Sequence, residues 1–121
     1  MKLEFTKELK DKWIEALESG KYTQGFGSLI ITKENNSISG KTEHCCLGVL
    51  SDIHSSLDNK ISNCKTRCMN PYNFIDNALG QHVRSILVDK NDRDATKAVE
   101  GEYPRDYSNV LPMTRQLKTV D

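Results

Sequence analysis

The sequence predicts an α+β fold, in which residues 1–121 form a single domain of about four helices and a small antiparallel β-sheet. Several segments repeat apolar residues at the three-and-four spacing of one helix face, which is typical of amphipathic helices. One short β-branched run is followed by turn-forming residues, as in a hairpin. A chain of 121 residues can bury one hydrophobic core but has little left for a second.

The first predicted helix covers about 7–19. Thr6 is a suitable N-cap, and Gly20 supplies the left-handed residue that commonly ends a helix. The apolar face consists of Leu9, Trp13, Ala16 and Leu17. Trp13 is most simply a core residue, and the alternative is that its indole stacks on a ligand.

A glycine-punctuated loop, residues 21–27, follows the first helix and has a composition suited to facing a ligand. The β-branched run 29–32 predicts a strand, and Asn35-Asn36 offers a turn. We therefore expect a β-hairpin whose return strand is 37–39.

The segment 46–57 is predicted to be the central core helix. Its apolar stripe consists of Cys46, Val49, Leu50, Ile53 and Leu57. Gly48 inside this helix costs about 1 kcal/mol relative to alanine. We expect another element to pack closely against it.

The second half of the chain is less regular. Residues 58–70 are polar and predict an exposed loop, with a strand inside it as the alternative. Asn70-Pro71 then supplies an N-cap and a proline at the first helical position. Helices are expected at about 71–79 and at about 81–89, the second of them ending near Asn91.

The charge run that begins at Asp89 predicts a solvated connector. A last helix is expected at about 109–118, with Pro112 in its first turn because proline fits only there. Its apolar face consists of Val110, Met113 and Leu117.

The charge balance disfavours several classes of partner, although it is compatible with a small polyanion in one pocket. The 17 basic and 17 acidic residues give a net charge of zero, which does not favour long nucleic acid or an anionic membrane. The first residues are charged and lack the apolar run of a signal peptide, and no window is long enough to span a membrane. We expect a cytoplasmic protein.

Four cysteines, at positions 45, 46, 64 and 68, raise the question of a metal site. Cys64-x3-Cys68 is loosely compatible with zinc, but Cys45 and Cys46 would point about 100° apart on a helix. Ordinary buried thiols are the simpler interpretation. We expect no metal and no cofactor.

Two enzymatic arrangements are conceivable. A cysteine–histidine pair could form from Cys45 or Cys46 with one of the three histidines, although no family-specific catalytic motif surrounds the cysteines. Asp89, Asp92 and Asp94 alternate like oxygen ligands, but the run lacks the glycine and the closing glutamate of an EF-hand. The prediction is that the protein is not an enzyme.

Amphipathic groups on the predicted loops would suit a nucleotide. Tyrosine rings stack on bases, glutamine bonds to base edges and arginine makes bidentate contacts with phosphate. The groups are Tyr22, Gln24, Tyr103, Arg105, Tyr107 and Arg115. The alternative for Tyr22 and Gln24 is that they staple the loop after the first helix to the core.

The pattern Trp13-x-x-Ala16-Leu17-x-Ser19-Gly20-x-Tyr22-x-Gln24, followed by Leu29 and Cys45-Cys46-Leu47-Gly48-Val49-Leu50, resembles a signature of small phage-encoded proteins. The resemblance covers roughly the first 50 residues of the chain. Downstream, Leu87 to Asp92 is similar to the L-x-x-x-N-D segment of that family, and an insertion, 93–107, displaces the helix that usually follows.

More distantly, the chain resembles phage antidefence sponges, which sequester cyclic dinucleotide signals of CBASS immunity. This resemblance implies a homo-oligomer in the infected host cytoplasm, with interface pockets that bind a ligand such as cGAMP without cleaving it. The implied ligand-binding residues are Tyr22, Gln24, Asn91, Tyr103, Tyr107 and Arg115. Asn91 would contact a base or ribose.

Two other classes stay open. One is a phage protein that inhibits a host protein by direct protein–protein binding, for which an exposed apolar patch would be the sign. The other is an enzyme that acts on nucleotides, which requires clustered carboxylates, histidines or a metal.

Overall fold

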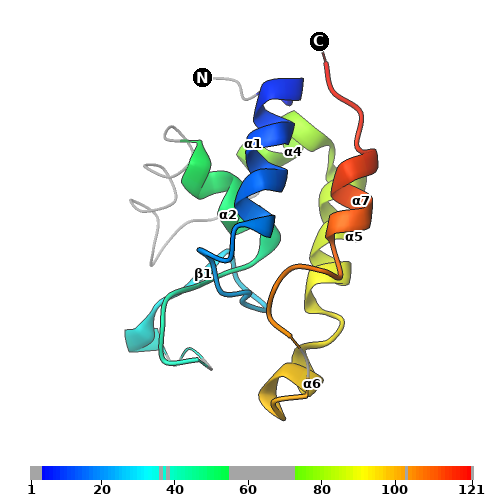
Figure 1. Ribbon diagram of the computed structural model, residues 1–121. Helices are drawn as coiled ribbons and strands as arrows, with labels where there is room; N and C mark the ends of the chain where they lie inside the picture. The colour runs from blue at the N-terminus through cyan, green and yellow to red at the C-terminus, as the bar shows by residue number, and fades with distance from the viewer. Residues whose placement is uncertain (1–3, 36, 38, 55–72, 103, 121) are drawn as a thin grey trace.

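A group of packed helices and one small two-stranded antiparallel sheet at its side form the structure (Figure 1). The computed structural model describes residues 4–35, 37, 39–54, 73–102 and 104–120. The elements are α1 (Lys7–Glu18), β1 (Ile30–Ile31), the 3₁₀ helix η1 (Lys33–Asn35), β2 (Glu43–His44), α2 (Cys46–Ile53), α4 (Asn73–Leu79), α5 (Gln81–Asp92), α6 (Ala95–Val99) and α7 (Leu111–Gln116). The predicted α+β class is confirmed.

Helix α1 forms as the sequence predicts. The Thr6 side chain accepts a hydrogen bond from the backbone N–H of Leu9 at 3.2 Å, so Thr6 is the N-cap. Gly20, with φ +77°, follows the end of the helix. Trp13 is fully buried and its indole N–H donates to the carbonyl of Cys46 at 2.8 Å. This bond fixes α1 against the start of α2.

The sheet differs from the predicted hairpin. β1 pairs antiparallel with β2, with Ile30 opposite His44 and Ile31 opposite Glu43. The return strand is therefore Glu43–His44, and the prediction of 37–39 was wrong for its described residues; position 38 lies outside them. The reason is that β2 has partners on both edges, since the backbone N–H of His44 also donates to the carbonyl of Thr23 at 2.9 Å.

Helix α2 is the centre of the core, as predicted. Every residue from Cys46 to Ser51 is buried. A Cβ atom on Gly48 would lie 1.9 Å from the carbonyl oxygen of Leu29, so the expected close packing is confirmed. The helix ends at Ile53, because His54 has an extended backbone, and residues 55–57 of the predicted helix lie outside the described residues.

Helices α4 and α5 form a hairpin around Gly80, whose φ is +89°. Arg84 on α5 pairs with Asp76 on α4 at 2.9 Å. Helix α5 covers Gln81–Asp92, so the helix predicted from about 81 with its end near Asn91 is confirmed. The predicted loop 58–70 and the Asn70-Pro71 cap lie outside the described residues.

The predicted connector contains a helix, α6, that the sequence reasoning missed. It has only five residues, which is too short for a periodic apolar face. The last helix, α7, begins at Leu111 with Pro112 in the first turn, as predicted. It is shorter than the predicted 109–118.

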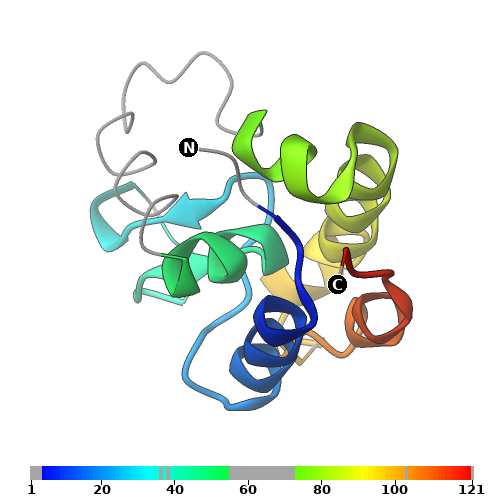
Figure 2. The ribbon, with the colours of Figure 1, turned by 90° about the horizontal axis from the view of Figure 1, so that it is seen from above.

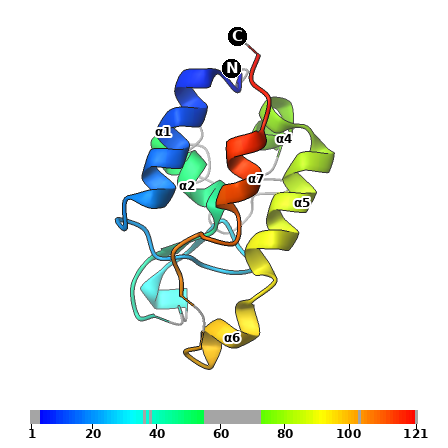
Figure 3. The same ribbon diagram turned by 45° about the vertical axis from the view of Figure 1, so that its right-hand side comes forward.

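Helix α2 contacts α1 on one side and α5 on the other, and α7 contacts α1 (Figures 2 and 3). The C-terminal segment returns to the start of the chain, where the backbone N–H of Val120 donates to the carbonyl of Phe5 at 3.0 Å. Helix α6 lies at the opposite end of the molecule (Figure 1). None of the helices in the described residues is long and apolar enough to cross a membrane.

Candidate functional site

Three side-chain amides meet where the loop after α1 crosses the end of α5. The Gln24 amide nitrogen donates to the Oδ1 atoms of Asn91, at 3.0 Å, and of Asn109, at 2.8 Å. Asn109 in turn donates to the carbonyls of Lys90, at 2.7 Å, and Asn91, at 3.2 Å. This amide cluster, Gln24, Asn91 and Asn109, joins three segments that are far apart in the sequence.

Both the oxygen and the nitrogen of the Asn91 side-chain amide make hydrogen bonds. Its Oδ1 also accepts from the backbone N–H of Cys46 at 3.2 Å, and its Nδ2 donates to the carbonyl of Gly25 at 2.8 Å and to Asp92 at 2.9 Å. Only 1% of Asn91 is exposed. A buried amide with all its bonds made is typical of a structural group.

A buried ion pair lies next to the amide cluster. Arg105 donates to the carbonyl of Gln24 from Nε at 2.9 Å and pairs with the Glu43 carboxylate at 2.9 Å. Burial of Glu43 disfavours its charged form, but hydrogen bonds from Ser39 and Arg105 outweigh this and hold the pKa of Glu43 below its ordinary value. Two acceptor atoms here, Gln24 Oε1 and Glu43 Oε1, are buried without a hydrogen-bond partner.

Tyr107 closes the same region from the other side. Its hydroxyl donates to the carbonyl of His44 at 2.6 Å, and only 1% of the residue is exposed. Burial raises the pKa of this phenol well above its ordinary value. The backbone φ of 67° is unusual for tyrosine and is held by these contacts.

Of the six residues predicted to bind a ligand, the five that the structure describes are therefore not gathered in one pocket. Gln24 and Asn91 are brought together, but they and Tyr107 face the interior, where protein groups occupy most of their polar atoms. Arg115 on α7 is exposed and pairs with Glu18 on α1. Tyr103 lies outside the described residues. For Gln24, this geometry agrees with the alternative in which it staples the loop to the core.

Tyr22 lies on the surface, in a shallow open groove between α1 and the end of α2. The groove has a volume of about 260 Å³. It is lined by Lys12, Glu15, Ala16, Ser19, Lys21, Tyr22 and Ile53. We call this surface the α1–α2 groove. Of the residues predicted to bind a ligand, Tyr22 lines it.

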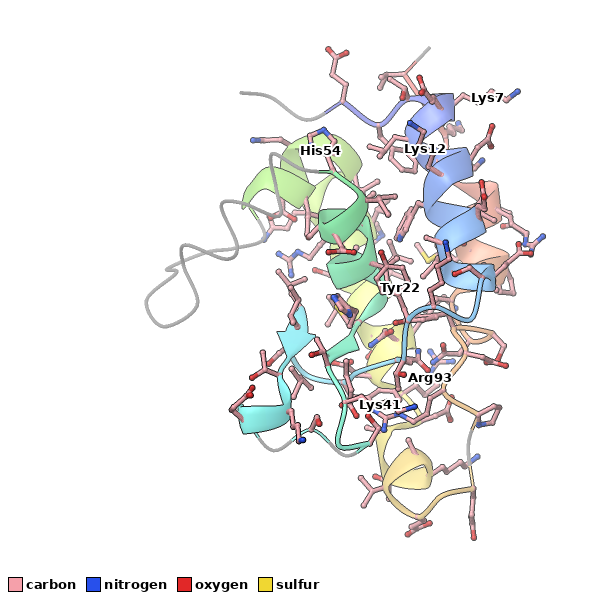
Figure 4. The ribbon with its side chains drawn as sticks, turned by 60° about the vertical axis from the view of Figure 1, so that its left-hand side comes forward. Lys7, Lys12, Tyr22, Lys41, His54 and Arg93 are labelled. Atoms are coloured by element: carbon pink, nitrogen blue, oxygen red, sulfur yellow. The ribbon has the colours of Figure 1, made fainter. Side chains whose placement is uncertain are left out.

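Two contacts orient Tyr22 within this groove. Its hydroxyl donates to the carboxylate of Asp52 on α2. Its ring meets the His44 ring edge to face, with the centroids 5.0 Å apart and an interplanar angle of 83°. Figure 4 shows Tyr22 and Lys12 on the same side of the molecule, with His54 near the end of α2. These contacts hold the aromatic ring in one orientation.

The charged residues of the groove come from one face of α1 and the turn after it. Lys12 is exposed and pairs with Glu8 at 3.1 Å. Lys21 and Glu15 are exposed, and neither side chain has an ion pair within the part of the chain that the structure describes. Lys12, Glu15 and Lys21 were not among the residues predicted from the sequence. The signal was the spacing of Lys12, Glu15 and Ser19, which places them on one helix face beside Tyr22.

Cys45 and Cys46 are free, buried thiols, as the simpler interpretation predicted. Burial raises the pKa of the Cys45 thiol to about 12 and that of Cys46 well above its ordinary value. Within the described residues, no group of three or more histidine, cysteine or acidic side chains could hold a metal ion. Cys64 and Cys68 lie outside that part of the chain.

Two of the three aspartates considered as metal ligands, Asp89 and Asp92, have other partners. Asp92 Oδ1 accepts from the backbone N–H of Gly27 at 3.1 Å and from Asn91 at 2.9 Å. Asp89 pairs with Arg93 at 3.6 Å on the surface of α5. Asp92 therefore fastens the loop after α1 to the end of α5.

Comparison with known proteins gives a family but no activity. No curated protein and no solved structure matches the chain. The family model described as "Domain of unknown function (DUF8296)" matches residues 5–92, well over half of the 121 residues. The matched region runs from the start of α1 to the end of α5 and so includes both the amide cluster residues Gln24 and Asn91 and the α1–α2 groove. The chain belongs to the DUF8296 family.

Proposed function

We propose that the protein is a phage antidefence protein that binds a cyclic oligonucleotide immune signal, such as cGAMP, and holds it without cleaving it. The observation that carries the proposal is the α1–α2 groove, where the ring of Tyr22 lies with the side chains of Lys12 and Lys21. An aromatic ring and nearby ammonium groups are what a base and its phosphate require.

The expected contacts have ordinary magnitudes. Stacking of a base on an aromatic side chain contributes about 1–3 kcal/mol. Exposed lysines attract a phosphate with a strength that falls as salt is added. The Tyr22 side chain loses little conformational entropy on binding, because Asp52 and His44 already orient it. These terms favour a base on Tyr22 and a phosphate toward Lys12 and Lys21.

The size of the groove supports an assembly of more than one copy. Pockets that enclose a drug-sized ligand have volumes of about 300–1,000 Å³. The α1–α2 groove, at about 260 Å³ and open to solvent, covers only part of a cyclic dinucleotide. A second copy that covers the remaining surface of the ligand would complete the site. We therefore propose a homo-oligomer.

The alternative function is inhibition of a host protein by direct binding, which calls for an exposed apolar patch. The large apolar side chains exposed among the described residues are Val99, 64% exposed, and Val120, 63% exposed. Val99 ends α6 and Val120 lies by the start of α1, at opposite ends of the molecule (Figure 3). Because single exposed apolar residues are common on any protein, they favour this alternative less than the groove favours a nucleotide.

The test is a thermal-shift and native-mass screen of cyclic di- and trinucleotides, followed by chromatography of the nucleotide released by heat. A ligand at a hundredfold excess over its dissociation constant stabilises the fold by about 2.7 kcal/mol. We expect a shift with at least one nucleotide, its recovery intact, and a mass of more than one chain. Lys21→Ala should weaken the shift, whereas Lys97→Ala on α6 should not.

Two results would overturn the proposal. If no nucleotide shifts the melting temperature, the groove is not a nucleotide site, and a pull-down from host lysate becomes the next experiment. If the released nucleotide is cleaved, the protein is an enzyme rather than a sponge.

A further inference from the structure

We infer that Glu15 makes the α1–α2 groove selective for guanine over adenine. This inference rests on the proposed function, since it concerns the base that the same groove receives. Glu15 lines the groove between Lys12 and Ser19 on α1, together with Tyr22 from the following turn. A carboxylate in a site proposed for an anion needs an explanation.

The surroundings of Glu15 leave its carboxylate available. Lys12, the nearest lysine along the helix face, has its ion pair with Glu8 at 3.1 Å. Glu15 itself has neither a hydrogen bond nor an ion pair in the described residues. Both of its oxygens can therefore accept hydrogen bonds from a ligand.

Base chemistry then decides which ligand fits. The Watson–Crick edge of guanine carries two adjacent donors, N1–H and the N2 amino group, which match the two oxygens of a carboxylate. Adenine carries one donor next to the N1 acceptor, so one carboxylate oxygen would face a lone pair. A bidentate, charge-assisted pair with guanine is favourable, and the adenine arrangement leaves an acceptor unpaired.

The placement of Tyr22 and the lysines agrees with this assignment. A base stacked on the Tyr22 ring would lie within the groove, whose lining on α1 includes Glu15. Lys21, which follows α1 and precedes Tyr22, remains for the phosphate. In this arrangement Tyr22 stacks on the face of the base, Glu15 accepts hydrogen bonds from the edge of the base, and Lys21 pairs with the phosphate.

The experiment measures, by calorimetry, the affinities for cyclic di-GMP and cyclic di-AMP, which differ only in their bases. The native chain should bind the guanine ring about tenfold to a hundredfold more tightly, as for one bidentate base contact. Glu15→Gln, which has one donor and one acceptor, should reduce that ratio to below about threefold. Glu100→Gln, an exposed glutamate next to α6, is the matched control and should leave the ratio unchanged.

The outcomes separate this inference from the function on which it rests. Equal affinities in the native chain, or an unchanged ratio in Glu15→Gln, would overturn guanine selection while nucleotide binding stands. Failure of both nucleotides to bind, together with failure of the wider screen, would overturn both. Thermal unfolding of each variant without ligand checks that these exposed substitutions leave the fold intact.

Discussion

Asn91, near the end of α5, accepts a hydrogen bond from the backbone N–H of Cys46, the first residue of α2, although the two are 45 positions apart. Helix α2 has no side-chain cap from its own N-cap residue, Cys45. The first N–H groups of a helix lack partners within it, and here a side chain from another helix supplies one. Asn91 therefore caps α2 from outside and couples the two central helices.

Replacing Asn91 by alanine should destabilise the fold by about 2–4 kcal/mol, because several buried partners each lose a hydrogen bond. The affected groups are the amide of Gln24, the carbonyl of Gly25 and the N–H of Cys46. Urea unfolding followed by circular dichroism measures the loss. Asn77→Ala, an exposed substitution on α4, should change stability by less than about 0.5 kcal/mol. Equal effects at the two positions would contradict the capping role.

Gly48→Ala tests the close contact between α2 and the strand. In an isolated helix, alanine is favoured over glycine by about 1 kcal/mol. Here the added Cβ would lie 1.9 Å from the Leu29 carbonyl oxygen. We therefore expect the free energy of unfolding to fall by about 1–3 kcal/mol. Gly20→Ala meets nothing within 4 Å and should cost only about 1–2 kcal/mol, from its positive φ. A Gly48→Ala variant as stable as the native chain would show that the backbone is not packed as described.

The Glu43–Arg105 pair predicts a dependence of stability on pH. The pKa of Glu43 lies below 4.5 in the fold, so the pair stabilises the protein above that value. This contribution is lost as the pH falls through the folded pKa. Glu43→Gln should lower stability at pH 7 by about 3 kcal/mol, because Arg105 stays partly buried without its counter-ion. It should also make the decline below pH 4.5 less steep, whereas the exposed Glu34→Gln should change neither.

The buried cysteines should be inert in the native state. With a pKa of about 12, only about one Cys45 thiol in ten thousand is ionised at pH 8. In a Cys64→Ser/Cys68→Ser background, a thiol reagent should label neither Cys45 nor Cys46 until denaturant is added. Rapid labelling of the folded protein would restore the cysteine–histidine nucleophile as a candidate.

Much of the fold was predictable because local patterns decide it. The Thr6 cap and the apolar spacing predicted α1, and the apolar spacing predicted the start of α2. Gly48 correctly indicated that another segment, at Leu29, packs closely against α2. The return strand was not predictable from β propensity. Glu43 and His44 form it because of their tertiary contacts: Glu43 pairs with Arg105, and the N–H of His44 donates to the carbonyl of Thr23. Helix α6 was not predicted, because five residues are too few to show the apolar periodicity of a helix.

The candidate site was predictable only in part, for a related reason. Gln24 follows the end of α1 and Asn91 lies in the last turn of α5, and by residue type both polar side chains look like ligand contacts. Their burial depends on how α2 and α5 meet, which single-residue chemistry does not reveal. The signature that includes them consists largely of residues that hold the core together. The groove residues Lys12, Glu15 and Lys21 lie outside that signature.

Tyr22 and Tyr107, two tyrosines that the sequence assigned to the same site, should respond differently to substitution. Tyr22→Ala should lower nucleotide affinity by about fivefold to a hundredfold, the worth of one stacked base, whereas Tyr22→Phe keeps the ring and should retain most of the affinity. Tyr107→Phe should leave affinity unchanged but cost about 1 kcal/mol of stability, because it removes only the bond to the His44 carbonyl. Calorimetric titration and urea unfolding of the three variants give both quantities. Loss of binding in Tyr107→Phe with retention in Tyr22→Ala would move the site from the α1–α2 groove to the amide cluster, and the interior would then have to open to receive its ligand.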